Sequence, residues 1–124
     1  MRKLHVAAAQ IHAGGGVKDV LRRIGCQAKA AAAVGVDVVL FSEGVLQGYD
    51  YDLTAEWIRQ VAEPLNGPAC DAIVKLAAQY KLTILAGFFE RDGEHYYNSV
   101  LVARPDGTRD VQRKHVLTGG EMKG

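Results

Sequence analysis

The sequence has few cysteines, no long apolar run and almost no excess of charge, and each shortage excludes a class of protein. Its two cysteines, Cys26 and Cys70, fit neither a metal-ligand spacing nor a disulfide framework. No apolar stretch approaches the roughly 20 residues that a helix needs to cross a bilayer. The 15 basic and 14 acidic residues leave a formal charge of +1, which argues against nucleic acid or an anionic membrane as the main partner.

The amino-terminal residues have only a superficial likeness to a secretory signal. Positive charges at Arg2 and Lys3 precede an apolar stretch, residues 4–9, that is too short for a signal-peptide core and fits a first strand better. We therefore expect a cytoplasmic protein. With 124 residues and 48% hydrophobic content, residues 1–124 are expected to form one domain with a modest core.

Hydrophobic periodicity and turn residues predict a βαβ unit followed by a meander of strands. The expected strands cover residues 4–10, 38–41, 82–89, 96–103 and 108–116, and the expected helices cover residues 17–34, 54–63 and a segment from Pro68 to Tyr80. Asp92-Gly93 and Asp106-Gly107 supply turns between the later strands. This order predicts an α/β fold with a mixed sheet and helices on one face.

A carboxylate directly follows the most apolar of these strands. Residues 38–41 are rich in β-branched side chains, which is typical of a strand covered on both faces. Glu43 comes next, with Gly44 and Gly48 behind it. Side chains just past such a strand line the crevice where α/β proteins bind ligands. Glu43 is therefore a candidate general base, and the alternative is a solvated residue in a loop.

Two other segments carry charge or glycine in a pattern that favours function. Lys114 follows Arg113 near the end of the last expected strand, where a lysine also serves as a solvated cation that discourages aggregation. The glycines at 14–16 precede a helix, so they are suited to hold an anion or simply to link two elements. They lack a complete phosphate-loop pattern, which favours the linker.

Taken in order, these segments resemble the nitrilase superfamily of carbon–nitrogen hydrolases. Gln10 closes the first strand, Gly67-Pro68 opens a helix, and Asn98-Ser99 opens a later strand. Glu43 is followed by Gly48-Tyr49, and Lys114 stands in an Arg-Lys-x-x-Leu segment. The resemblance covers essentially the whole chain. It implies part of an α-β-β-α sandwich, truncated to its amino-terminal portion, in which one apolar face of the sheet is left uncovered.

The resemblance also assigns chemistry. It implies that Glu43 is the general base, that Lys114 stabilises the tetrahedral intermediate, and that Glu121 is a second structural or catalytic glutamate, unless it is a solvated terminal residue. The family's nucleophilic cysteine is expected beyond Lys114, and none occurs in the ten residues that follow it. Ser42 is a smaller departure, because many relatives have proline before the glutamate.

The remaining reactive side chains have plainer interpretations. Cys70 lies in the first turn of a predicted helix, where a helix dipole lowers a thiol pKa, so it is a weak alternative nucleophile. Cys26 falls between apolar helix positions and is expected in the core. Tyr49 and Trp57 either line a pocket or belong to the core. The four histidines form no pair at helical metal-ligand spacing, so no metal and no cofactor are expected.

Three functions compete at this point. The first is hydrolysis of a small amide or nitrile through a Glu-Lys-Cys triad whose cysteine is absent, so that the chain alone is inactive. The second is a non-catalytic truncated pseudoenzyme that associates with a copy of itself, as a homo-oligomer, or with another subunit through its uncovered face. The third is a doubly wound nucleotide-binding domain that uses the glycines at 14–16, and the incomplete glycine motif counts against it.

Overall fold

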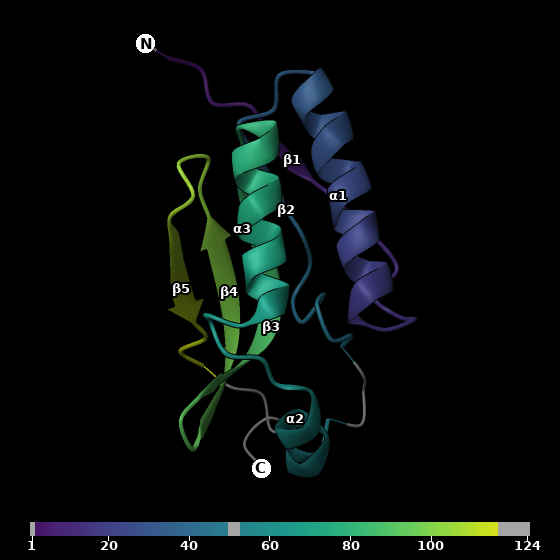
Figure 1. Ribbon diagram of the computed structural model, residues 1–124, viewed down its shortest axis with the longest axis vertical. Coiled ribbons are helices and arrows are strands. Elements are labelled where there is room, and N and C mark those ends of the chain that lie inside the picture. Colours follow the sequence, from purple (N-terminus) through teal and green to yellow (C-terminus); the bar gives the residue numbers. More distant parts are fainter. Residues whose placement is uncertain (1, 50–52, 117–124) are drawn as a thin grey trace.

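Five strands form one mixed sheet in the computed structural model, which describes residues 2–49 and 53–116 (Figure 1). The strands are β1 (Val6–Ala8), β2 (Val38–Leu40), β3 (Thr83–Asp92), β4 (His95–Ala103) and β5 (Arg109–Arg113), and they lie side by side in that order. β1, β2 and β3 are parallel, whereas β4 and β5 are antiparallel to their neighbours. The described strand order never reverses, which argues against a nucleotide-binding crevice of the doubly wound type.

The three helices lie close to the ranges that the sequence predicts. α1 (Val17–Ala33) is stopped by Gly35, whose φ of 78° is costly for other residues. α2 (Ala55–Val61) begins after Thr54, whose hydroxyl accepts a hydrogen bond from the Trp57 backbone N–H at 3.1 Å. α3 (Pro68–Tyr80) has its proline in the first turn, where the missing N–H costs nothing. The predicted helices are confirmed to within three residues at each end.

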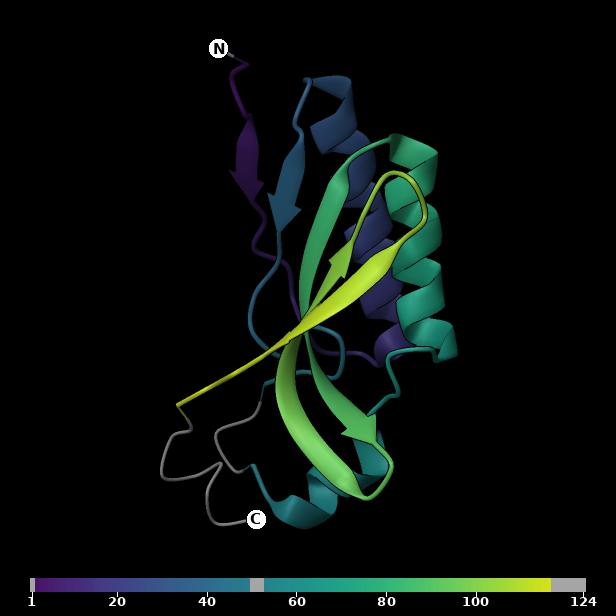
Figure 2. The same cartoon turned by 90° about the vertical axis from the view of Figure 1, so that its left-hand side faces the viewer.

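α1 and α3 cover the same face of the sheet (Figure 2). This follows from the strand order. The β1–β2 and β2–β3 connections both join neighbouring parallel strands, and the sheet grows in the same direction each time. Because such connections have the same hand, their helices α1 and α3 lie on the same side of the sheet. The hydrophobic core lies between these helices and the sheet. It is built from buried side chains of both layers, among them Val20, Ile24, Ala28, Ile73, Ala77, Ile84, Phe88 and Leu101.

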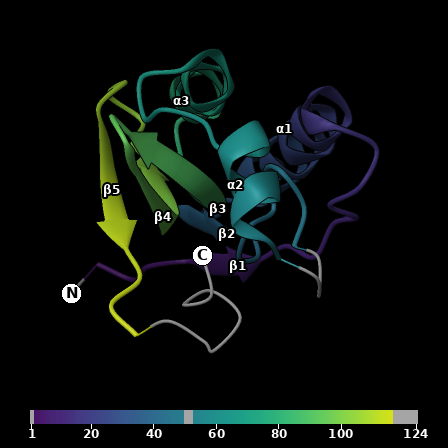
Figure 3. The ribbon, with the colours of Figure 1, turned by 90° about the horizontal axis from the view of Figure 1, so that it is seen from below.

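Within the described part of the chain, no helix covers the opposite face of the sheet at β1 and β2 (Figure 3). Val6 in β1 is 61% exposed and Leu40 in β2 is 43% exposed. Val39, which directly precedes Leu40 and points to the other face of the sheet, is buried. The prediction that the 38–41 strand is covered on both faces is therefore wrong, because Leu40 is exposed and, among residues 2–49 and 53–116, only the α1–α3 face has a second layer. The prediction that one apolar sheet face lies open is confirmed.

Small residues allow α1 and α3 to pack closely. Ala28 and Ala31 are buried, and Gly25 lies against Leu76 of α3. Cys26, however, is exposed, so its predicted place in the core is wrong. It follows the buried Ile24 by two residues, and a step of two residues turns about 200° around a helix, away from the core.

Three of the strands, β1, β2 and β5, are shorter than predicted. β1 and β2 contain three residues each, and β5 ends at Arg113 rather than continuing to residue 116. β3 is longer than predicted and reaches Asp92, so its lower half extends beyond the end of β2. Beyond Leu85, β3 has no β2 residue beside it. There the loop that follows β2 packs against β3.

Candidate active site

Glu43 is held where β3 has a glycine instead of a side chain. The Phe41 backbone N–H donates to the Leu85 carbonyl at 2.8 Å, which continues the β2–β3 pairing past the end of β2. A Cβ added at Gly87 would lie 2.5 Å from the Gly44 nitrogen and 2.7 Å from the Glu43 Cα. Gly44 itself has a φ of 59°. The loop that carries Glu43 can therefore approach β3 this closely only because residue 87 lacks a side chain.

The Gln47 side chain anchors the same loop to the lower half of β3. Its Oε1 accepts the Phe89 backbone N–H at 2.9 Å, and its Nε2 donates to the Phe89 carbonyl at 3.1 Å and to the Val61 carbonyl at 3.3 Å. The amide thus occupies the backbone groups that β2 would have paired with had it been longer. Because Gln47 lies four residues after Glu43, this contact fixes the far end of the Glu43 loop.

Lys114 and Asn98 meet the Glu43 carboxylate from the other side. The Glu43 Oε1 atom accepts hydrogen bonds from the Lys114 Nζ at 2.9 Å and from the Asn98 Nδ2 at 2.6 Å. The Lys114 backbone N–H also donates to the Asn98 carbonyl at 2.8 Å, so the end of β5 stays beside β4. Glu43 and Lys114, 71 positions apart in the sequence, are therefore in direct contact.

This carboxylate–ammonium pair is partly exposed. The side chain of Glu43 is 46% exposed and that of Lys114 is 30% exposed. The apolar, rigid surroundings that the sequence predicts for Glu43 are present on the β3 side, but the opposite side of the carboxylate faces solvent. A carboxylate beside an ammonium can exchange a proton and can also stabilise an anion, so the pair has the groups needed for acid–base chemistry.

Neither cysteine lies in this cluster. Cys70 is completely buried in α3, and burial raises the pKa of its thiol to about 12. A thiol with so high a pKa is almost wholly protonated near neutral pH, which removes the nucleophilic thiolate. The prediction that the helix dipole lowers the Cys70 pKa is therefore wrong, because desolvation outweighs the helix terminus. Cys26 is exposed on α1, on the helical layer of the fold.

A cavity of about 530 Å³ opens beside Lys114. It lies between α2 and the β3–β4 hairpin, and its walls include Ile58 and Arg59 from α2 and Phe89, Asn98 and Lys114 from the sheet side. Its walls combine apolar and aromatic side chains with charged and polar ones, so a small polar molecule could be held there by both kinds of contact. The cavity also lies at the carboxyl ends of the parallel strands, where α/β sheets bind ligands.

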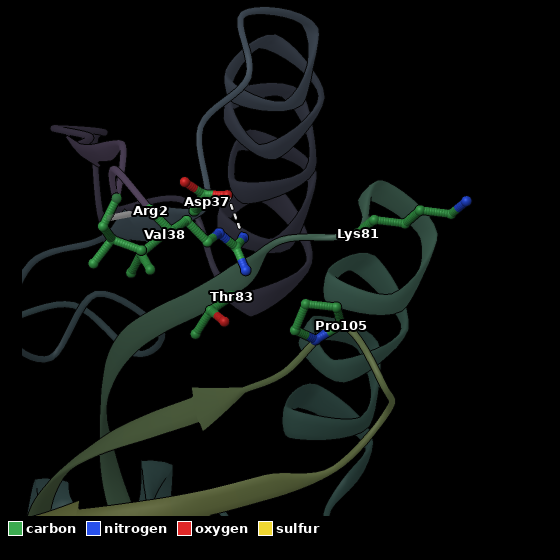
Figure 4. A pocket seen from close by; sticks show the side chains of 7 residues that line it. Arg2, Asp37, Val38, Lys81, Thr83 and Pro105 are labelled. Atoms are coloured by element: carbon green, nitrogen blue, oxygen red, sulfur yellow. Dashed lines mark hydrogen bonds and ion pairs between the residues drawn. The ribbon is translucent and has the colours of Figure 1, made fainter.

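A second cavity, of about 320 Å³, lies at the opposite end of the sheet (Figure 4). Its walls include Asp37 and Val38 at the start of β2 and Thr83 at the start of β3. Arg2 lies 3.3 Å from Asp37 and is already paired with it. Hydrogen bonds from the His5 backbone N–H and from Arg2 hold the Asp37 pKa below its usual value. These amino-terminal strand ends lie far from Glu43, so this cavity is not part of the candidate site.

The described residues show no metal centre and no membrane helix. No group of three His, Cys, Asp or Glu side chains among residues 2–49 and 53–116 is arranged to hold a metal ion. No helix in this part of the chain is long and apolar enough to cross a membrane. At the glycine loop at 14–16, the Arg23 guanidinium donates to the carbonyls of His12 and Gly14. The loop thus presents these carbonyl oxygens to a cation, whereas a phosphate-binding loop would present backbone N–H groups to an anion.

The structure brings together two of the three predicted site residues. Glu43 and Lys114 are in contact, whereas Glu121 lies outside the described residues. Tyr49 and Trp57 pack against Phe89, with ring centroids 6.3 and 5.5 Å away, and neither is among the residues that line the two cavities described above.

Three residues that position Glu43 were not predicted as site residues. They are Gly87, Gln47 and Asn98. Asn98 alone had a signal in the sequence, since it is part of the Asn98-Ser99 pair on which the resemblance rests. Gly87 allows the Glu43 loop to lie close to β3, and the Gln47 amide binds the loop to the β3 backbone. No local sequence pattern identifies either residue.

The comparisons with known proteins point in the same direction as this geometry. The family model described as carbon-nitrogen hydrolase matches residues 5–123. The chain is 30% identical over 112 residues to Hydrolase Rv0480c of Mycobacterium tuberculosis, which covers 90% of this chain and 38% of that protein. It is 30% identical over 96 residues to the Protein N-terminal amidase of Saccharomyces cerevisiae, covering 76% and 21%.

A solved structure shares the fold. The carbon-nitrogen hydrolase from Helicobacter pylori G27 superposes with a TM-score of 0.81 at 17% identity, over 94% of this chain and 41% of that one. At this identity the likeness concerns the fold alone. The chain thus spans well under half the length of these relatives.

Proposed function

Because the chain belongs to the carbon–nitrogen hydrolase family, we propose that its Glu43–Lys114 pair provides the acid–base and charge-stabilising groups of a site that hydrolyses small amides or nitriles. The observation that carries the proposal is the 2.9 Å contact between the Glu43 carboxylate and the Lys114 ammonium, together with the fact that Lys114 also lines a cavity of about 530 Å³. The amidase activities named for relatives agree with this class of substrate.

In the proposed reaction on an amide, a thiol sulfur attacks the carbonyl carbon and a C–S bond forms. Glu43 accepts the thiol proton, and the carbonyl oxygen becomes an oxyanion that the Lys114 ammonium stabilises, an effect of about 3 kcal/mol for a well-placed donor. Glu43 then gives its proton to the leaving nitrogen as the C–N bond breaks. Water, deprotonated by Glu43, hydrolyses the thioester and regenerates the thiol.

The sulfur of this reaction is missing from the candidate site. Cys70 is buried with a raised pKa and Cys26 is exposed on α1. We therefore expect residues 1–124 by themselves to release no ammonia from amides or nitriles. Glu121, a third proposed site residue, is expected to support Lys114 or the leaving nitrogen.

The proposal is tested by expression of this chain together with whatever coding sequence follows the Gly124 codon, followed by an assay of ammonia release from a panel of short aliphatic amides and nitriles. The expected result is turnover that falls at least about a hundredfold in Glu43→Gln and in Lys114→Met, the factor that loss of one such group costs. Cys70→Ser is the matched control and is expected to leave turnover unchanged. An extended protein that contains a further cysteine and turns over none of the panel would contradict the proposal.

The open sheet face favours a second candidate function, association without catalysis. Leu4 is 64% exposed and Val6 is 61% exposed, alongside Leu40. Exposed apolar side chains that are contiguous on a sheet mark an interface or an aggregation risk. We propose that the chain in isolation forms a homo-oligomer through this face. Size-exclusion chromatography with light scattering is expected to show an assembly larger than 13.4 kDa, and a stable monomer would contradict this candidate.

A further inference from the structure

A second carboxylate, Glu90, lies on the opposite face of the same strands from Glu43. It is almost completely buried, with 2% exposure. Its Oε2 accepts hydrogen bonds from the Ser99 hydroxyl at 2.7 Å and from the Arg113 Nε at 3.0 Å, and its Oε1 accepts one from the Arg113 Nη2 at 2.8 Å. The guanidinium and the carboxylate thus form a two-pronged ion pair, the geometry in which such pairs are strongest and most directional.

The Arg113 side chain is also fixed from two further directions. Its guanidinium carbon lies 3.7 Å from the centre of the Tyr97 ring, and its Nη2 donates to Asp92 at 2.8 Å. These contacts raise the pKa of Arg113 above its ordinary value, chiefly through the hydrogen bonds with Glu90. The Nε and Nη2 atoms of the guanidinium therefore each have defined acceptors, and the flat side of the group lies on the Tyr97 ring.

Arg113 and Lys114 are consecutive, and so are Ser99 and Asn98. Successive side chains of a strand point to opposite faces. Arg113 pairs with Ser99 across the β4–β5 ladder, and the next backbone N–H, that of Lys114, bonds to the Asn98 carbonyl at 2.8 Å. A fixed Arg113 on one face thus determines where the Lys114 side chain leaves the backbone on the other face.

We infer that the Glu90–Arg113 ion pair, together with Ser99, positions Lys114 against Glu43. The inference rests on the proposed role of Lys114 in the hydrolase site. Residues 90 and 113 touch neither the Glu43 carboxylate nor the cavity, so they are positioning residues and not catalytic ones. Lys114 follows the last residue of β5, and without this anchor the strand end would fray as strand termini do.

The test measures where the Lys114 amine lies rather than turnover. The chain is exposed to a short pulse of an amine-acylating reagent, and mass spectrometry gives the rate at Lys114 relative to the rate at Lys29, an exposed lysine on α1. Glu43→Gln defines the rate at Lys114 when the contact with the Glu43 carboxylate is removed. Arg113→Gln is expected to raise the relative rate by about three- to fivefold, toward the Glu43→Gln value, which is the protection that a partly exposed ion pair gives.

Three further variants sharpen the result. Glu90→Gln is expected to act like Arg113→Gln, and Ser99→Ala is expected to give a smaller increase. Asp110→Asn is the matched control, because Asp110 pairs with Arg104 at the other end of β5, and it should leave the Lys114 rate unchanged. If Glu90→Gln fails to fold, as judged by circular dichroism, Arg113→Gln and Ser99→Ala decide.

Folded Arg113→Gln and Ser99→Ala proteins that label Lys114 at the native rate would overturn the inference, as would an equal increase in Asp110→Asn. Neither result bears on the proposed reaction, which ammonia release measures separately. Conversely, an extended enzyme without amidase activity would leave the labelling result intact.

Discussion

Two clusters of the same chemical make-up lie back to back on the β3–β5 sheet. Each contains a glutamate, a cation and an uncharged polar side chain: Glu43, Lys114 and Asn98 on one face, and Glu90, Arg113 and Ser99 on the other. The carboxylate of the first is 46% exposed and that of the second is 3% exposed. The comparison teaches that burial, and not the choice of residues, separates an anchoring cluster from one that is accessible to a substrate.

The largest expected effect breaks the buried cluster. Glu90→Ala leaves the buried Ser99 hydroxyl without its acceptor and removes the main partner of Arg113, so we expect a loss of about 3 kcal/mol in the free energy of unfolding. Glu43→Ala, in the exposed cluster, should cost less than about 1 kcal/mol. Urea unfolding of both variants measures the difference, and equal losses would contradict the distinction drawn from burial.

The next effect concerns the backbone beneath the exposed cluster. Gly87→Ala places a methyl group 2.5 Å from the Gly44 nitrogen, so the loop must move, and we expect a loss of about 2 kcal/mol together with release of the Glu43–Lys114 contact. Gly25→Ala is the matched control. Its methyl would lie 3.5 Å from Leu76 in ordinary contact, and alanine within a helix should stabilise by about 0.5–1 kcal/mol. Urea unfolding of both proteins, with Lys114 labelling, measures this.

A third experiment compares the strength of the two ion pairs directly. A double-mutant cycle with Glu43→Gln and Lys114→Met should give a coupling of about 0.5 kcal/mol, because both groups are partly solvated. In 1 M salt this coupling should largely disappear. The corresponding cycle with Glu90→Gln and Arg113→Gln should give a larger coupling that salt reduces little. A salt-independent Glu43–Lys114 coupling would show that the pair is more enclosed than its exposure indicates.

The smallest effect concerns Asp37, a partly exposed carboxylate that accepts hydrogen bonds from the His5 backbone N–H and from Arg2. The pKa of Asp37 is lowered in the folded protein, chiefly by the His5 backbone N–H, so its contribution to stability is present above its unfolded pKa, near 3.8, and is lost as the pH falls through the folded value. Asp37→Asn should therefore show a weaker loss of stability than the native chain below about pH 4, and no difference in pH dependence from pH 5 to 8. Thermal unfolding across this range measures it.

Most of the fold could be predicted because local residues determine it. Gly35, Thr54 and Pro68 set helix ends through backbone conformation and capping, and they act wherever the helix packs. The coverage of a strand is not local. The apolar run at residues 38–41 predicts a strand correctly, but whether Leu40 is covered depends on a layer that residues 2–49 and 53–116 do not include.

The candidate site could be predicted only in part, for the same reason. The end of an apolar strand predicts Glu43 and the resemblance adds Lys114, but their contact depends on the register that places Arg113 opposite Ser99. Register is set by turn lengths and by the pattern of buried side chains along both strands. The role of Glu90 depends on the same register, so neither its burial nor its partners could be inferred from the residues around it.

The Gln47 amide affects whether other molecules can add a strand to this sheet. Where β2 stops, the outer edge of β3 would present unpaired backbone groups to solvent, which is the template on which strands of other molecules add. At Phe89 the Gln47 side chain bonds to both backbone groups, and the Glu63 N–H also donates to the Phe89 carbonyl. On either side, the Arg91 N–H donates to the Glu63 carbonyl and the Gly87 carbonyl accepts the Leu46 N–H. The lower sheet is thereby closed to intermolecular strand addition at this edge, and growth of aggregates there would first require that amide to leave.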